Sequence, residues 1–426
     1  MKKTLLTICL TWMCFSLSAQ KIIDLSGKWS FSIDRQDNGE KEKWFSHTLN
    51  DCINLPGSMP EKLKGDEVTA KTQWTGSLYD SSYYYNPYME KYRKEGNIKF
   101  PFFLTPDKHY VGAAWYQKEV NIPADWKGER ILLFLERPHI ETTVWVNGQK
   151  TGMQNSLCVP HQYDITRYVR PGKCTITIRV DNRIKEINVG PDSHSITDQT
   201  QGNWNGIVGR ICLQTTPKTY FDDIQIYPEP EQKLARVKVV IKGAGITKIK
   251  LSAESFNTDK KHIVPAIQQE IKLNKGVTET EMVLPMGNDM LLWDEFHPAL
   301  YKLKAEVTNG KKTEIKEIQF GMRRFEIKGK WFYVNGRKTQ LRGTVENCDF
   351  PLTGYAPMDV ESWERVFRIC RSYGLNHMRF HSFCPPEAAF IAADRVGFYL
   401  QPEGPSWPNH GPKLGLGQPI DTYLMN

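Results

Sequence analysis

Three short segments near the end of the chain decide the fold: TQLRG at 339–343, LNHMRFH at 375–381 and FYLQ at 398–401. Each has the length and apolar content of a strand, and a helix-length segment separates each from the next. Strands that alternate with helices predict parallel βαβ units. A TIM barrel needs eight such units in roughly 250 residues, and this sequence holds about three. We therefore expect residues 323–426 to form the N-terminal part of a (β/α)8 TIM barrel, incomplete in the sequence given.

The helices between these segments carry clear start and stop signals. Asp359 is an N-cap residue, because its carboxylate can accept hydrogen bonds from the first turn of a helix. Gly374 can adopt the left-handed conformation that ends the same helix. A second helix is predicted to start at Pro385 and to stop at Gly397.

Upstream of these units the sequence is β throughout. Thr175–Val180 alternates apolar and polar residues with the period of a strand. Asn147-Gly148 supplies the positive φ values that a two-residue hairpin turn needs. Short strands separated by Gly and Pro predict a sugar-binding jelly-roll domain over residues 21–219.

A second β unit is predicted over residues 220–322. Residues 237–241 and 301–307 are alternating strands within a span of about 100 residues, which is typical of an immunoglobulin-like β-sandwich. No catalytic pattern occurs in this unit, so we interpret it as a spacer.

Residues 65–110 form a long insertion in the first unit. Long loops within compact domains are uncommon and often functional. Its aromatic rings could stack on sugars or dock the insertion onto its own domain, and we give docking the greater weight. The aromatic residues are Trp74, Tyr79, Tyr83, Tyr84, Tyr85, Tyr88 and Tyr92.

The first 20 residues predict a signal peptide. Lys2 and Lys3 precede an apolar run, Leu5–Leu17, and Ser18-Ala19-Gln20 offers a small-residue cleavage site. The apolar run is short for a membrane span, and no other segment approaches that length. We expect the mature protein to be periplasmic or secreted.

Composition and charge exclude several classes of partner. Of the 426 residues, 40% are hydrophobic and 24% charged, as in soluble globular proteins. The net charge of +8 comes from scattered basic residues, so we expect no nucleic-acid partner. The cysteines lack zinc spacing, and neither a metal nor a cofactor is expected. A Cys158–Cys174 bridge is left open, as is homo-oligomerisation.

The chain resembles glycoside hydrolase family 2, which includes β-galactosidases, β-glucuronidases and β-mannosidases. The order jelly roll, immunoglobulin-like sandwich, barrel is itself specific to that family. The motifs that carry the resemblance are Trp115-Tyr116-x-Lys118-x-Val120, Val144–Gly148, Tyr163–Thr166, Phe320–Arg323, Val334–Gly336 and Leu341–Gly343.

The resemblance implies a retaining glycosidase that hydrolyses terminal β-linked sugars from oligo- or polysaccharides. Such enzymes use two carboxyl groups about 5 Å apart. In the family, the acid/base is the Glu of an Asn-Glu pair after strand four, and the nucleophile follows strand seven. This sequence has no Asn-Glu dipeptide, so we expect the catalytic pair beyond Asn426. The alternative is a catalytically inactive, truncated chain that acts only as a carbohydrate-binding protein.

Polar residues follow the three predicted barrel strands at their carboxyl ends, the face where barrel active sites form. The candidate substrate-binding residues are Asn347, Asp349, Arg379, His381, Glu403 and Trp407. In the family, an Arg at the end of strand two and a nearby His line the sugar subsite. The order Arg379-Phe380-His381-Ser382 departs from the usual Arg-x-Ser-His. An exposed Trp beside a barrel mouth can form a sugar platform.

A structural role is the competing interpretation for three of these residues. Arg379 could pair with Glu403 and only hold the rim together. His381 could be a rim histidine, and Asp349 could serve only a turn.

We predict that the exported protein starts near Lys21, because the sequence places the cleavage site at residues 18–20. N-terminal sequencing of the protein from a secreting host tests this. A chain that retains Met1 in the membrane fraction would contradict it.

Overall fold

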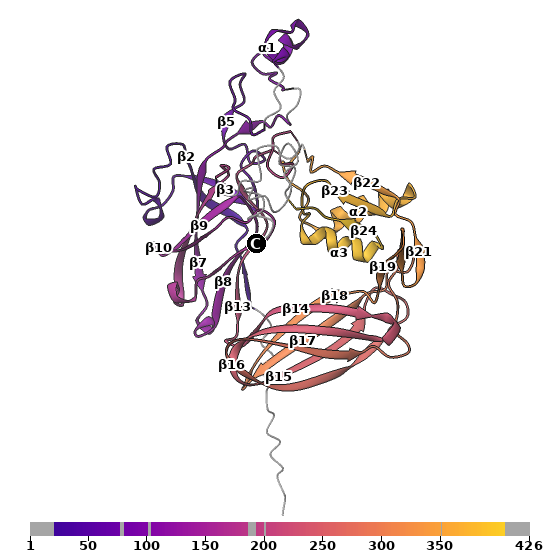
Figure 1. Ribbon diagram of the computed structural model, residues 1–426. Helices are drawn as coiled ribbons and strands as arrows, with labels where there is room; N and C mark the ends of the chain where they lie inside the picture. The colour runs from indigo at the N-terminus through magenta and orange to yellow at the C-terminus, as the bar shows by residue number, and fades with distance from the viewer. Residues whose placement is uncertain are drawn as a thin grey trace, which may run out of the picture.

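The computed structural model describes residues 21–76, 81–100, 104–185, 193–199, 202–350 and 352–404. The described elements form three groups in chain order (Figure 1). A first sandwich, indigo to magenta, stands beside a yellow group of strands and helices, and a second sandwich lies below both. The described part is mostly β-sheet.

The first sandwich consists of two antiparallel sheets. One has the order β1-β13-β8-β11, with β4 paired to β13. Its strands are β1 (Ile22–Asp24), β13 (Gly206–Thr216), β8 (Arg130–His139), β11 (His161–Asp164) and β4 (Gly57–Ser58). The other has the order β10-β9-β12-β7-β2-β3. Its strands are β10 (Gln149–Gln154), β9 (Glu141–Val146), β12 (Gly172–Asp181), β7 (Ala113–Ile122), β2 (Gly27–Asp34) and β3 (Asp51–Leu55).

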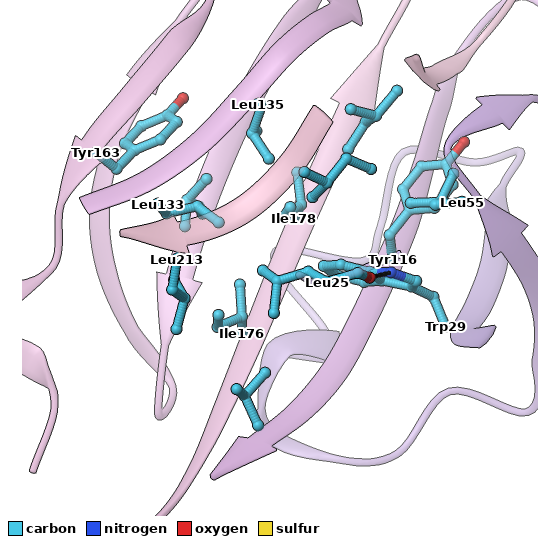
Figure 2. Close-up of a cluster of buried hydrophobic side chains, with 14 of the residues drawn as sticks. Leu25, Trp29, Leu55, Tyr116, Leu133, Leu135, Tyr163, Ile176, Ile178 and Leu213 are labelled. Carbon is cyan, nitrogen blue, oxygen red and sulfur yellow. Dashed lines mark hydrogen bonds between the residues drawn. The ribbon is translucent and has the colours of Figure 1, made fainter. Parts of the chain in front are cut away.

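The core of this sandwich lies between the two sheets (Figure 2). Ile176 and Ile178 of β12 face Leu133 and Leu213 of the opposite sheet, and all four side chains are fully buried. The alternation predicted for β12 is therefore confirmed. The predicted turn is confirmed too, because Asn147 and Gly148 have φ values of 50° and 77° and join β9 to β10.

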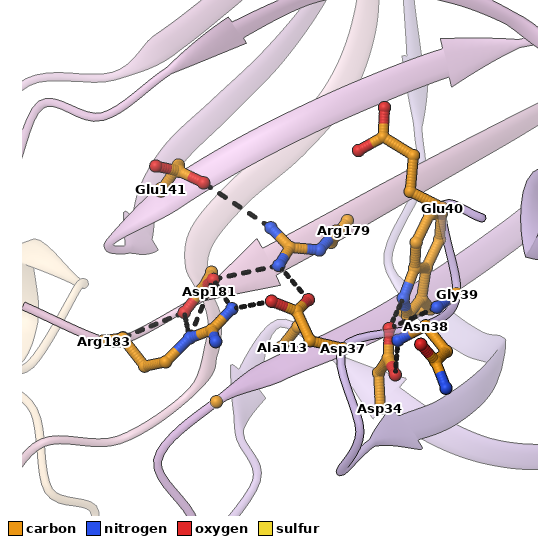
Figure 3. Close-up of polar contacts among 12 residues, drawn as sticks. Asp34, Asp37, Asn38, Gly39, Glu40, Ala113, Glu141, Arg179, Asp181 and Arg183 are labelled. Carbon is orange, nitrogen blue, oxygen red and sulfur yellow. Dashed lines mark hydrogen bonds and ion pairs between the residues drawn. The ribbon is translucent and has the colours of Figure 1, made fainter. Parts of the chain in front are cut away.

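The polar face of β12 is also buried, by an ion-pair network (Figure 3). Arg179 donates through Nη2 to Asp37 at 2.5 Å and to Asp181 at 3.0 Å. Arg183 reaches the same two carboxylates. A buried charge is tolerated only when it is paired, and here every member has a partner. The network fastens the loop after β2 over the sheet.

The insertion at 65–110 has a small core of its own. It holds β5 (Asp66–Glu67), α1 (Ser82–Tyr85) and β6 (Lys108–His109). Tyr83 is buried, stacks on Phe100 at 4.5 Å between ring centroids, and donates to the Tyr92 carbonyl. Both partners lie within the insertion, so Tyr83 belongs to the insertion's own core. Tyr85 and Tyr88 are exposed, and Tyr79 lies outside the described residues.

The second sandwich contains five antiparallel strands. They are β14 (Tyr220–Glu229), β15 (Leu234–Ser255), β16 (Ile263–Pro285), β17 (Tyr301–Asn309) and β18 (Lys312–Phe320). The long strand β15 pairs with β14, β16 and β17, and its register shifts between Gly243 and Gly245. Val237, Val239 and Ile241 are fully buried, as their alternation predicts.

The third group begins with an antiparallel sheet and continues with a parallel one. The first holds β19 (Phe325–Lys328), β20 (Trp331–Val334) and β21 (Arg337–Thr339). The second holds β22 (Gly343–Glu346), β23 (His377–Phe380) and β24 (Tyr399–Gln401), connected by α2 (Val360–Ser372) and α3 (Glu387–Val396).

The predicted position of the first parallel strand, 339–343, is wrong. Thr339 pairs with Phe332 as part of the hairpin that Asn335-Gly336 closes, and it has no partner in the parallel sheet. The parallel strand starts at Gly343, opposite His377. Two predicted helix signals are confirmed: Asp359 accepts from the Ser362 N–H at 2.8 Å, and Gly397 ends α3 with a φ of 76°. The second helix is predicted to start at Pro385, whereas α3 begins at Glu387 after the N-cap Pro386.

Within the described ranges, no helix is long and apolar enough to span a membrane.

The seven described cysteines form no disulfide. Cys174 is buried in the first sandwich, whereas Cys158 packs with Leu157 and Ile196 in a separate small cluster. The Cys158–Cys174 bridge is thus absent from the structure.

We predict that Ile178→Ala destabilises the protein by about 2–5 kcal/mol, because it removes a buried side chain from the centre of the first sandwich. Ile22→Ala is the matched control, since Ile22 lies on an edge strand and is 58% exposed. Urea unfolding of the two variants measures the difference. Equal losses would contradict the assignment of the core.

Candidate functional site

The three parallel strands end at one edge of their sheet. Glu346 of β22 lies opposite Phe380 of β23, and Arg379 lies opposite Gln401 of β24. The His381 N–H then donates to the Glu346 carbonyl at 2.8 Å, which continues the pairing beyond the strands. Neighbouring parallel strands lie about 4.8 Å apart, so the residues that follow them meet at this edge.

Glu403 connects the ends of β23 and β24. Its carboxylate accepts from Nε of Arg379 at 2.5 Å and from the backbone N–H of Ser382 at 2.8 Å. Burial opposes ionisation of Glu403, but these hydrogen bonds outweigh it and hold the pKa below its usual value. Glu403 is therefore an anion at neutral pH, and it fixes both the guanidinium and the following loop.

Two histidines and an asparagine lie beside this pair. Nδ1 of His381 is 3.1 Å from Oδ1 of Asn347, which follows β22. His194, from the loop before β13 of the first sandwich, donates through Nδ1 to the His381 carbonyl at 3.2 Å. The two imidazole rings pack edge to face, with 4.3 Å between their centroids. Burial lowers the pKa of His194, and the neighbouring His381 adds to this shift, so His194 is neutral at pH 7.

Sequence reasoning missed His194. It belongs to the first sandwich and is almost 200 positions from His381 along the chain. No local pattern links the two residues, because only the packing of the sandwich against the sheet brings them together. Ser195 of the same loop also joins the first sandwich to the loop after β23, because its hydroxyl donates to the Ser382 carbonyl at 3.1 Å.

The carboxyl group at the end of β22, that of Glu346, has an unusually high pKa. Glu346 accepts from the Cys348 N–H at 2.8 Å. Burial raises the pKa of Glu346 to about 7, and the negative charge of Asp349 acts in the same direction. Asp349 itself is exposed.

The backbone at this edge adopts strained conformations. Cys348 and Ser382 have φ values of 65° and 61°, in the left-handed region that side chains other than glycine rarely enter. Such residues cluster at functional sites and persist where surrounding contacts hold them. The Ser382 N–H bond to Glu403 is one of those contacts.

The structure thus brings together four of the six candidate residues, namely Asn347, Arg379, His381 and Glu403. Asp349 is not among them, and its charge acts instead on the carboxyl group of Glu346 at the end of β22. Trp407 lies outside the described residues. Among the described residues, no three His, Cys, Asp or Glu side chains are arranged to hold a metal ion.

Comparison with known proteins identifies the class. The family model described as "Glycosyl hydrolases family 2, sugar binding domain" matches residues 22–217, and that described as "Glycosyl hydrolases family 2" matches residues 219–323. The chain belongs to glycosyl hydrolase family 2.

Its curated relatives are glycosidases. The β-galactosidase of Thermoanaerobacter pseudethanolicus is 25% identical over 334 residues, covering 74% of this chain and 42% of the relative. The human β-glucuronidase is 23% identical over 441 residues, covering 95% of this chain and 58% of the relative. The chain spans about half the length of the curated relatives it matches.

Solved structures show the same fold. The β-glucuronidase from Ruminococcus gnavus superposes with a TM-score of 0.66 at 20% identity, covering 91% of this chain and 60% of that one. A family 2 member from Bacteroides cellulosilyticus gives a TM-score of 0.66 at 19% identity, covering 90% of this chain and 46% of that one.

We predict that the Glu346 carboxyl makes stability depend on pH. Its pKa is about 7 in the folded protein and near 4.5 when unfolded, so the folded state holds more protons between these values. Stability should therefore fall as the pH rises from about 4.5 to 7. Glu346→Gln, which mimics the neutral group, should flatten this dependence in urea unfolding.

Glu361→Gln is the control for this experiment, because Glu361 is an exposed carboxylate on α2. It should leave the pH dependence as in the wild type. An unchanged slope in Glu346→Gln would show that this carboxyl does not titrate in that range.

Proposed function

We propose that this chain belongs to a retaining glycosidase that hydrolyses terminal β-linked sugars from oligo- or polysaccharides. Residues 21–219 form its jelly-roll domain, 220–322 its immunoglobulin-like domain, and 323–426 the opening of a TIM barrel. Membership of family 2 and the glycosidase relatives support this proposal. The parallel order β22-β23-β24, with a helix after each of the first two strands, suits a barrel.

The observation that carries the proposal is the Arg379–Glu403 pair at the carboxyl edge of these strands. Within the described residues, the Arg379 side chain makes one hydrogen bond, through Nε. Its side chain is 40% exposed, so the terminal guanidinium nitrogens can donate to a ligand. Glu403 holds the guanidinium in place beforehand, which lowers the entropic cost of binding.

The neighbouring groups suit a sugar. Hydroxyl groups can donate to or accept from Asn347 and His381, and charge-assisted bonds from Arg379 add strength. His194 forms a wall of this edge from the first sandwich. In this proposal the residues of the chain bind and orient the terminal sugar, and the catalytic carboxylate pair comes from later barrel strands.

The proposal also includes export of the mature protein to the periplasm or the medium. The charged start, apolar run and small-residue site of residues 1–20 support it. An exported enzyme would meet polysaccharides outside the cytoplasm.

We predict that Arg379→Ala weakens sugar binding about tenfold or more, since a hydrogen bond to a charged group contributes about 1.5–3 kcal/mol. Ligand-observed NMR titration with phenyl β-D-glucuronide and phenyl β-D-galactoside measures the affinity. The matched control is Arg368→Ala on α2, where Arg368 pairs with Glu364 away from this edge. It should bind as the wild type does.

Equal affinity in Arg379→Ala and wild type would contradict the site. Hydrolysis of either glycoside by residues 21–426, lost in Glu403→Gln, would also contradict the roles assigned here. It would make Glu403 a catalytic residue, whereas we assign it to positioning Arg379.

A further inference from the structure

Three thiols gather where the loop after β23 meets the first sandwich. Cys158 and Cys384 line one small cavity of about 30 Å3, together with Arg137. Cys348 interacts electrostatically with Cys158. Cys158 and Cys384 are half-buried, whereas Cys348 is fully buried. A reagent from solvent can therefore reach the first two more easily than the third.

Arg137 fixes the backbone of Cys384 at the cavity that Cys384 shares with Cys158. Arg137 of β8 donates through Nη1 to the Cys384 carbonyl at 3.1 Å and through Nη2 to the Pro385 carbonyl at 3.4 Å. Cys158 and Cys384 also interact electrostatically, as neighbours at this cavity. Cys158 is held from its own side, because it packs against the buried side chains of Ile140, Leu157 and Ile196.

This geometry suits a covalent bond between the two sulfurs. A disulfide needs Cα atoms about 4–7 Å apart, and two cysteines that line one cavity of about 30 Å3 are neighbours in the fold. The Cys384 thiol now donates to the Pro385 carbonyl at 3.7 Å. In a bridge to Cys158, the Cys384 sulfur would give up this weak bond.

We propose that Cys158 and Cys384 form a disulfide, by exchange with a low-molecular-weight disulfide, that ties the loop after β23 to the first sandwich. One thiolate attacks a sulfur of the small disulfide and releases one thiolate, which leaves a mixed disulfide. The second cysteine thiolate then attacks the protein sulfur of that mixed disulfide and releases the second small thiol. The two cysteines lose two electrons and two protons, and the small disulfide is reduced to two thiols.

The bridge would join segments that are distant in sequence. Closing the long loop between them would restrict the unfolded chain and so stabilise the folded state. It would also fix the loop that carries His381 and Ser382. The inference does not depend on the proposed glycosidase activity, because it concerns the junction itself.

The test uses residues 21–426 incubated with oxidised glutathione at about pH 9. Burial raises the pKa of Cys158 to about 11 and also raises the pKa of Cys384, so alkaline pH increases the reactive thiolate. Proteolysis without reductant, followed by mass spectrometry, should yield one linked peptide pair with Cys158 and Cys384. The melting temperature should rise by ~5 °C and return on reduction.

Cys158→Ser and Cys384→Ser should each abolish the linked peptide and the rise in melting temperature. Cys52→Ser is the control, since Cys52 is exposed on β3, and it should behave as the wild type. A link to Cys348, glutathione adducts on Cys158 or Cys384 without the linked peptide, or an unchanged melting temperature in the oxidised wild type would overturn the proposal. The peptide analysis of wild-type protein decides the pairing even if a variant fails to fold.

Discussion

One carboxylate holds the candidate site together. Glu403 accepts from the Arg379 side chain and from the Ser382 N–H, so it joins the ends of two neighbouring strands. The second bond also stabilises a backbone conformation that is costly for a residue other than glycine. Without this carboxylate, the guanidinium would lose its orientation and the loop after β23 would lose its anchor. The geometry of the site therefore depends on an interaction that itself need not touch a ligand.

The two sandwiches hold the parallel sheet from two sides. The first contacts the loop after β23 through Ser195 and Arg137. The second reaches α3, where the Trp293 indole donates to the Asp394 carbonyl at 2.7 Å. The parallel sheet and its two helices bury a core of their own around Trp363, Phe367 and Phe380, and these junctions fix the position of that unit against the sandwiches. They also explain how a histidine of the first sandwich becomes part of the site.

The sequence predicted those features that local physical chemistry determines. The hairpin at Asn147-Gly148, the Asp359 cap and the alternation in β12 follow from residue type and period, and all three occur. Because neighbouring parallel strands end at one edge of a sheet, the sequence also predicted that Arg379 and Glu403 lie close together, and they are hydrogen-bonded. The first parallel strand was misplaced because residues 337–339 complete a hairpin, which a strand pattern alone does not reveal. His194 and the pKa of Glu346 arise from tertiary packing and burial, and no sequence pattern encodes either.

A crystal structure of residues 21–426 with phenyl β-D-glucuronide or phenyl β-D-galactoside tests the central claim most directly. The account predicts a sugar ring at the carboxyl edge of β22, β23 and β24, with a hydroxyl or carboxylate oxygen within about 3.5 Å of the Arg379 guanidinium. The Arg379–Glu403 and Ser382–Glu403 bonds should persist in the complex. A sugar bound on the first sandwich, for example at the exposed Tyr85 and Tyr88, with this edge empty, would contradict it.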